Sequence, residues 1–177
     1  MTAPIRPASS KAFQREKWIF IPTIASATLA PTVAEATGGT TLDISCMLFD
    51  GTARPQKNTN LVDRVRRICD GAVYQQIGTT NYTGGEMLAA FDPQAAAASD
   101  GKKAWEKFPA GTTGYLWRRM GIAVATDVAA GQFGDTFPVE FDEPFPTTVG
   151  DGEAAENAFL SVFAITGPPG FNKAVLA

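Results

Sequence analysis

The sequence predicts a mainly β fold with one flanking α-helix. Short apolar and β-branched segments are repeatedly interrupted by turn residues, with 17 glycines and 12 prolines among 177 residues. In residues 135–141, Phe137, Val139 and Phe141 recur at every second position, as in a strand with one buried face. Only residues 102–108 carry a clear helical stripe. We therefore expect a β-sandwich or partly closed barrel with a helix on its side.

Seven or eight strands are expected along the chain. The first is the apolar run KWIFI at residues 17–21, which Pro22 ends. Residues 65–69 mix arginines with apolar residues and are ambiguous between strand and helix, and residues 142–157 read as an acidic connection rich in Pro and Gly. The candidate strands are residues 17–21, 40–49, 72–77, 86–91, 113–124, 135–141 and 158–166.

Two segments have helical features. Residues 102–108 place Ala104, Trp105 and Phe108 on one side, which predicts a helix packed against a sheet. Residues 32–36 are long enough for one helical turn, which the glycine pair that follows would stop.

The composition is that of one globular domain covering residues 1–177. Apolar residues make up 45% and charged residues 19%, a balance unlike that of a disordered chain. Three peripheral segments are polar or contain turn residues: an N-terminal arm at 1–14, a projecting loop at 50–60 and a C-terminal arm at 167–177.

The residue inventory excludes several kinds of chemistry. The chain has no histidine, so the triads, dyads and zinc sites that depend on imidazole are ruled out. Neither glycine pair, at 38–39 or at 84–85, precedes Lys-Ser or Lys-Thr as in a phosphate-binding loop. We expect no cofactor, no metal site and no enzymatic activity.

Charge is distributed unevenly along the chain. Residues 1–119 carry 14 basic and 10 acidic side chains, a net charge of +4, whereas residues 120–177 carry one basic and eight acidic side chains, a net charge of −7. This split is compatible with uneven solubilising charge on an ordinary surface. It is also what head-to-tail self-association would use, with a basic face of one copy against an acidic face of the next.

Nothing in the sequence indicates export or membrane insertion. The first residues lack the apolar core of a signal peptide, and no stretch approaches the roughly 20 apolar residues of a membrane-spanning helix. The two cysteines, Cys46 and Cys69, have apolar neighbours and are expected to be reduced, buried thiols after cytosolic synthesis.

An ordered series of segments spans nearly the whole chain. The segments are FIPTIA at 20–25, PTVAEATGGT at 31–40, FDPQ at 91–94, GTTGYLWRR at 111–119, AAGQ at 129–132, DTFPV at 135–139 and FAITGPP at 163–169. In this order they resemble the major tail proteins, or tail tube proteins, of long-tailed non-contractile bacteriophages, in particular phages of actinobacteria.

This resemblance implies a fold and a function. Proteins of this kind have a β-sandwich or barrel core with a helix on its side, form six-membered rings, and stack into a hollow tube through which the genome passes. A long loop and the terminal arms link successive rings. The resemblance also implies a virion protein made in the host cytoplasm. Its partners would be further copies of itself, the tape-measure protein in the lumen, and the tail terminator and distal tail proteins.

The charge split suggests which residues join successive copies. Arg54 and Lys57 lie in the predicted loop at 50–60, and the acidic C-terminal part offers carboxylates to a neighbouring copy. Exposed ion pairs contribute only about 0–1 kcal/mol each, so apolar contacts of the arm would have to supply most of the affinity. The candidate interface residues are Arg54, Lys57, Asp142, Glu143, Asp151 and Glu153.

A lumen that conducts DNA should not bind it. Each phosphate neutralised by Lys or Arg releases counterions and adds affinity, so we expect a lumen that is neutral to acidic. Arg118 and Arg119 are the candidates for exceptions, but neighbours in a strand point to opposite faces. We expect them to pair with carboxylates instead.

Other functions are compatible with parts of the sequence. An enzyme would have to use the adjacent Asp142 and Glu143, whose side chains diverge in a strand, or Cys69 beside two arginines. A nucleic-acid-binding protein could use RVRR at 64–67 with Tyr74 and Tyr82, although the net charge is negative. A tail terminator, head–tail connector or capsid decoration protein would share the β-rich fold and ring assembly.

Overall fold

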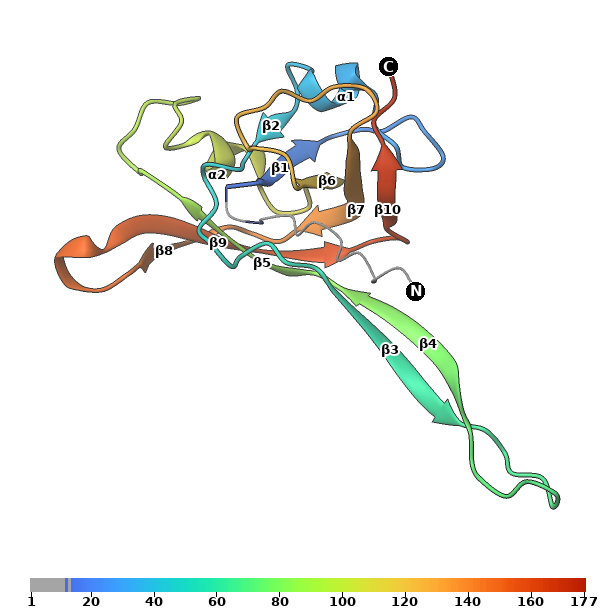
Figure 1. Ribbon diagram of the computed structural model, residues 1–177. Coiled ribbons are helices and arrows are strands. Elements are labelled where there is room, and N and C mark those ends of the chain that lie inside the picture. The colour runs from blue at the N-terminus through green and yellow to red at the C-terminus, as the bar shows by residue number, and fades with distance from the viewer. Residues whose placement is uncertain (1–11, 13) are drawn as a thin grey trace, which may run out of the picture.

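A computed structural model of the chain describes residue 12 and residues 14–177, and within this part the protein is mainly β (Figure 1). The predicted N-terminal arm at 1–14 therefore lies almost entirely outside the described residues. Ten strands, two short α-helices and one 3₁₀ turn are described. In chain order they are β1 (Glu16–Ile21), α1 (Val33–Thr37), β2 (Leu42–Asp43), β3 (Gln56–Asp63), β4 (Gln75–Thr83), β5 (Gly85–Ala90), α2 (Lys103–Lys107), β6 (Thr113–Met120), β7 (Phe133–Phe141), β8 (Phe145–Val149), η1 (Gly152–Ala154), β9 (Glu156–Ile165) and β10 (Gly170–Ala174).

Eight strands form one antiparallel sheet that curls into a half-barrel, which confirms the predicted fold class. Its main path runs β2-β1-β6-β7-β9-β5, with β8 added to β9 and β10 added to β7. Strand β7 organises the centre, because it pairs with β6 over residues 135–140 and also with β9 near its end and with β10 near its start. The remaining two strands, β3 and β4, form a separate two-stranded ribbon.

Around β1 the sheet is buried on both faces. On β1, Trp18 and Phe20 belong to the larger aromatic core, whereas Ile19 and Ile21 belong to a smaller cluster on the other face. This explains why the β1 sequence is apolar throughout instead of alternating. The predicted stripe of Phe137, Val139 and Phe141 lies in the larger core, as expected. Other members of the larger core are Ile44, Met87, Phe91, Phe108, Leu116, Phe159 and Phe163.

Each helix covers one of the two clusters. Helix α2 buries Ala104 and places Phe108, the residue after its end, against the aromatic rings of Phe20 and Phe141, with ring centroids 5.1 and 4.4 Å away. Helix α1 buries Ala36 in the smaller cluster. Its first turn is fixed by a capping box in which Thr32 and Glu35 bond each other's backbone N–H groups. Both predicted helical segments are confirmed.

Two strand predictions require correction. Residues 40–49 form only the two-residue strand β2, because Asp43 Oδ1 accepts hydrogen bonds from both the backbone N–H and the hydroxyl of Ser45 and turns the chain. The acidic connection at 142–157 contains strand β8, which pairs with β9 in a hairpin. Prolines are tolerated there because β8 is an edge strand.

The C-terminal residues lie against the sheet and do not extend as an arm. Strand β10 pairs with β7, and the carbonyl of Leu176 accepts a hydrogen bond from Val33 N–H at 2.9 Å. Residues 167–177 thus close one side of the half-barrel in this conformation of the chain.

Gly84 marks the point where the β3–β4 ribbon leaves the sheet. A Cβ atom at this position would lie 1.7 Å from the backbone oxygen of Phe163 in β9. We expect Gly84→Ala to force the ribbon away from β9 and to destabilise the chain by about 1–3 kcal/mol, the usual cost of overpacking. Thermal unfolding of the unassembled protein checks this. The matched control is Gly39→Ala, because open space surrounds that position. Gly51→Ala would not serve as a control, because Gly51 has a φ of +83°. An unchanged melting temperature for Gly84→Ala would contradict the prediction.

Candidate assembly surfaces

The ribbon of β3 and β4, which we call the hairpin (residues 56–83), is largely exposed (Figure 1). Its sequence is rich in Thr, Asn and Gln, which can pair across strands in solvent: Thr59 and Thr80 hydroxyls lie 3.4 Å apart, for example. All eight residues of β3 are exposed. In Figure 1 the hairpin extends away from the sheet as a projection.

Apolar side chains on the hairpin are exposed on a scale that a monomer does not explain. A two-stranded hairpin is marginally stable in water, and exposed apolar groups gathered on one projection indicate a contact surface. Val65 is 89% exposed and Ile77 is 75% exposed. The exposed apolar residues of the hairpin are Leu61, Val62, Val65, Ile68, Val73, Tyr74 and Ile77.

The hairpin is anchored at its base. The Tyr82 ring lies 5.9 Å from that of Phe171 in β10, which in turn contacts Phe137 of the core at 6.0 Å. This aromatic chain and the close approach at Gly84 hold the direction in which the hairpin leaves the sheet.

The hairpin ends in a basic loop, residues 64–74, which we call the tip. Two hydrogen bonds to Asp70 shape the tip: Arg66 Nε donates to the Asp70 carbonyl at 2.9 Å, and the Arg67 backbone N–H donates to Asp70 Oδ2 at 2.8 Å. No salt bridge between described residues involves Arg64, Arg66 or Arg67. The tip therefore presents three guanidinium groups and one carboxylate, with Val65 and Ile68 between them.

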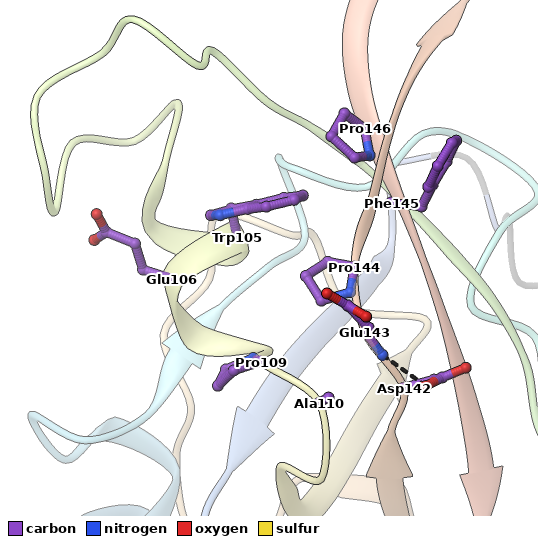
Figure 2. Close-up of a pocket in the computed structure, with 9 residues that line it drawn as sticks. All are labelled: Trp105, Glu106, Pro109, Ala110, Asp142, Glu143, Pro144, Phe145 and Pro146. Atoms are coloured by element: carbon purple, nitrogen blue, oxygen red, sulfur yellow. Dashed lines mark hydrogen bonds between the residues drawn. The ribbon is translucent and has the colours of Figure 1, made fainter.

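A second surface lies between α2 and the chain that leads into β8. This open cavity of about 880 Å³ we call the groove (Figure 2). Trp105 and Glu106 come from α2 on one side, and Pro144 and Pro146 from the other (Figure 2). The lining residues are Trp105, Glu106, Pro109, Ala110, Asp142, Glu143, Pro144, Phe145 and Pro146.

The groove combines a fixed apolar wall with negative charge. The Trp105 ring is held by stacking on Phe91 at 4.5 Å. Asp142 accepts a hydrogen bond from the backbone N–H of Glu143 at 2.8 Å (Figure 2), and Glu106 accepts one from Ala98 N–H at 3.0 Å. No described salt bridge involves these three carboxylates. The Glu106 carboxylate turns away from the groove and also lines a hollow with Lys103 and Lys107, so the negative charge of the groove comes from Asp142 and Glu143 (Figure 2).

The comparison with known families identifies the kind of protein that carries these surfaces. A family model described as "Phage tail tube protein" matches residues 3–177.

The chain belongs to the phage tail tube protein family.

This membership confirms the resemblance to phage tail tube proteins drawn from the sequence, and makes the protein a structural component of a virion that self-assembles into a tube. The family is one of structural proteins and is not known for catalysis. No curated protein matches the chain.

The two basic residues predicted as interface residues, Arg54 and Lys57, differ in their surroundings. Arg54 precedes the hairpin and lies near carboxylates of its own chain, 3.6 Å from Glu16 and 3.7 Å from Asp50. Lys57 is on β3, exposed, and outside every described salt bridge. The predicted loop at 50–60 is thus a turn followed by the first residues of a strand.

The sequence-predicted acidic residues fall into two places. Asp142 and Glu143 line the groove, whereas Asp151 and Glu153 are exposed in the turn between β8 and β9. The structure does not bring any of the four to Arg54 or Lys57 within one chain. Their pairing between copies stays a prediction.

Arg118 and Arg119 both make their contacts inside the subunit. Arg118 pairs with Asp135 at 2.8 Å, as predicted, and lies over the rings of Trp18 and Phe137. Arg119 points to the opposite face, but its predicted carboxylate partner is wrong: it is fully buried and bonds backbone carbonyls and Gln132.

The expectation of buried thiols is wrong. Cys46 and Cys69 are both free and exposed, Cys46 in the turn after β2 and Cys69 in the tip. Among the described residues, no group of three or more Cys, Asp or Glu side chains could hold a metal ion. None of the helices in this part of the chain is long and apolar enough to cross a bilayer.

The tip is the surface whose role is least well predicted from the sequence. The RVRR segment at 64–67 suggests only a nucleic-acid patch or an element ambiguous between strand and helix. A usable signal is nevertheless present: three arginines, two β-branched residues and a cysteine occur within six positions that have neither helical nor strand periodicity. Such a segment is typical of an exposed contact loop.

Proposed function

We propose that the chain forms the hollow tail tube of a long-tailed, non-contractile bacteriophage of actinobacteria, as hexameric rings stacked into a conduit for genome ejection. The observation that carries the proposal is the family match over residues 3–177, joined with a hairpin whose apolar side chains are left in solvent. In this assembly, edge strands such as β5, β8 and β10 pair or pack with neighbouring subunits.

The partners follow from the same proposal. The tape-measure protein fills the lumen during assembly, the tail terminator and distal tail proteins cap the two ends, and viral DNA passes without specific binding. The enclosure of Arg118 and Arg119 within the subunit supports a lumen of low phosphate affinity, because neither guanidinium is free to contact DNA.

The test is negative-stain electron microscopy of the purified protein across protein concentration and salt. Long hollow tubes of uniform width, with six-fold symmetry in end views, are the expected result. Discrete rings that never stack would favour the alternative, a tail terminator, head–tail connector or capsid decoration protein. Monomers under every condition, also when tape-measure protein is added, would contradict the proposal.

The predicted contacts of Arg54 and Lys57 with Asp142, Glu143, Asp151 or Glu153 of the next subunit can be tested separately. The double variant Arg54→Glu with Lys57→Glu is expected to raise the critical concentration for tube formation about fivefold, the effect of about 1 kcal/mol from exposed pairs. Sedimentation at low and high salt measures it. Because Arg54 already has acidic neighbours in its own chain, Lys57→Glu alone should account for most of the effect. If the double variant assembles as the wild type does, the predicted pairing is wrong.

A further inference from the structure

The tip of the hairpin is complementary to the groove in charge and has apolar side chains as well. The walls of the groove are apolar and carry the carboxylates of Asp142 and Glu143, neither of which has a basic partner in a described salt bridge. The tip carries three arginines without an acidic side-chain partner in a described salt bridge, together with exposed Val65 and Ile68. The two surfaces therefore carry opposite charges, and both also present apolar side chains.

A tip does not reach the groove of its own subunit. Strand β3 alone spans about 26 Å at 3.3 Å per residue, and Figure 1 shows the hairpin extending away from α2 and β8. The base of the hairpin is fixed by Tyr82 against Phe171 and by the close packing at Gly84, so it cannot fold back without breaking these contacts. The tip that meets a groove must come from another copy.

We propose that the tip, residues 64–74, of one subunit docks in the groove between α2 and β8 of a second subunit. This rests on the proposed function, because it specifies one of the contacts by which the tube assembles. The contact is heterologous: each subunit contributes a tip to one neighbour and a groove to another, so it propagates instead of closing on itself as a two-fold dimer would.

The chemistry of the groove suits arginine. Planar guanidinium groups bind carboxylates in a two-pronged geometry and pack on aromatic rings, and the groove offers both, with Trp105 on the α2 side and Glu143 on the other (Figure 2). Pro109, Pro144 and Pro146 restrict the backbone around the groove, so little freedom is lost when it is filled. Asp142 and Glu143 are thereby assigned to the tip, which leaves Asp151 and Glu153 for Lys57.

Charge reversal tests the contact. Arg64 and Arg67 are the residues to change, because neither side chain makes a hydrogen bond among the described residues. R64E with R67E is expected to raise the critical concentration for tube formation roughly 100-fold, since it places like charges together. The matched variant R64K with R67K, which keeps the charge but loses the planar fork, should assemble with a smaller defect. Both should melt as the wild type when unassembled.

The reciprocal charge reversal, in the groove, provides the decisive experiment. D142K with E143K should impair tubes to a similar extent, and the chain that carries all four reversals should recover to within about tenfold of the wild type. Recovery identifies a direct contact, because two unrelated defects would add. If the four-fold variant is as defective as either double variant, the proposed contact is wrong.

Cross-linking within wild-type-like tubes gives an independent readout. In a Cys46→Ser background, Cys69 of the tip is joined by a short bis-maleimide to the thiol that Glu143→Cys introduces in the groove. Mixed isotope-labelled subunits should give an intermolecular link between Cys69 and position 143. The control is Thr23→Cys, at an exposed position after β1, which should link roughly tenfold less.

The two proposals fail differently. If the wild type forms no tubes, the proposed function fails before the variants are compared. If the wild type forms tubes but the tip variants assemble equally well, or Cys69 links no better to position 143 than to position 23, only the tip–groove contact is overturned.

Discussion

Replacing residues 57–82 with an Asn-Gly turn is expected to abolish tube formation while leaving the sheet folded. Gln56 and Thr83 are paired at the base of the hairpin, so a two-residue Asn-Gly loop can join them in an antiparallel geometry. The deletion removes the exposed apolar side chains and the tip, yet removes only one aromatic contact with the core, between Tyr82 and Phe171. We expect a loss of about 0.5–1.5 kcal/mol in the free energy of unfolding.

Two measurements separate assembly from folding. Electron microscopy and sedimentation should find no tubes at concentrations at which the wild type polymerises fully, and thermal unfolding should find a monomer close to the wild type. The matched control removes only the Tyr82–Phe171 contact, by Tyr82→Ala. Because the close packing at Gly84 still directs the hairpin, this variant should form tubes, at a higher protein concentration than the wild type. Tubes from the deletion variant would contradict the assigned role of the hairpin, whereas an unfolded variant would show that the hairpin belongs to the folding unit.

Much of the fold could be predicted because burial leaves a periodic trace in the sequence. The stripe of Phe137, Val139 and Phe141 and the apolar run at 17–21 both correspond to strands of the buried sheet. Helix α2 follows from the spacing of Ala104, Trp105 and Phe108. These elements are where local pattern and tertiary packing agree.

The hairpin could not be predicted in this way because neither of its faces is buried. Alternation of apolar and polar residues arises from a strand with one side in the core, and β3 has all its residues in solvent. Strand β8 escapes prediction for a related reason: it is an edge strand that contains Pro146, and its pairing with β9 depends on a turn whose Gly150 and Gly152 have positive φ. Both segments acquire their structure from pairing rather than from burial.

The candidate surfaces could be predicted only in part. Charge asymmetry points to Asp142 and Glu143, which do line the groove, but spacing along the chain cannot show that they lie across from Trp105 of α2. Arg54 is a candidate in the sequence because it is a cation in a polar segment, and the acidic neighbours that it finds in Glu16 and Asp50 become adjacent only in the fold.

The substitution with the largest expected effect on folding is at Arg119. This side chain is fully buried, and its two terminal nitrogens make four hydrogen bonds: to the carbonyls of Ala123, Thr126 and Asp127 and to Gln132 Oε1. Burial lowers the pKa of the guanidinium from its ordinary value, but arginine remains charged at neutral pH. The loop at 121–132 is therefore organised around one cation.

We expect Arg119→Met to destabilise the protein by about 3 kcal/mol or more, because it leaves several buried acceptors without a donor. For a chain of this size the melting temperature should fall by roughly 6–12 °C. Arg119→Lys is the matched variant: it keeps the charge, cannot reach four acceptors at once, and should fall between Met and the wild type. Differential scanning calorimetry measures all three, and a Met variant within 2 °C of the wild type, a limit set at about the effect of 1 kcal/mol, would contradict the prediction.

The damage should also spread in a defined direction. The same loop holds the C-terminus, since Gly131 N–H donates to the Val175 carbonyl and Val175 N–H donates to the Gln132 carbonyl. Leu176 in turn accepts a hydrogen bond from Val33 at the start of α1. Hydrogen exchange in Arg119→Met should therefore accelerate at 121–132 and at residues 175 and 33, while the amides of β5 and β9 on the far side of the sheet stay protected. Exchange that rises uniformly over the chain would mean that Arg119 supports the whole core and not this loop and the C-terminal strand attached to it.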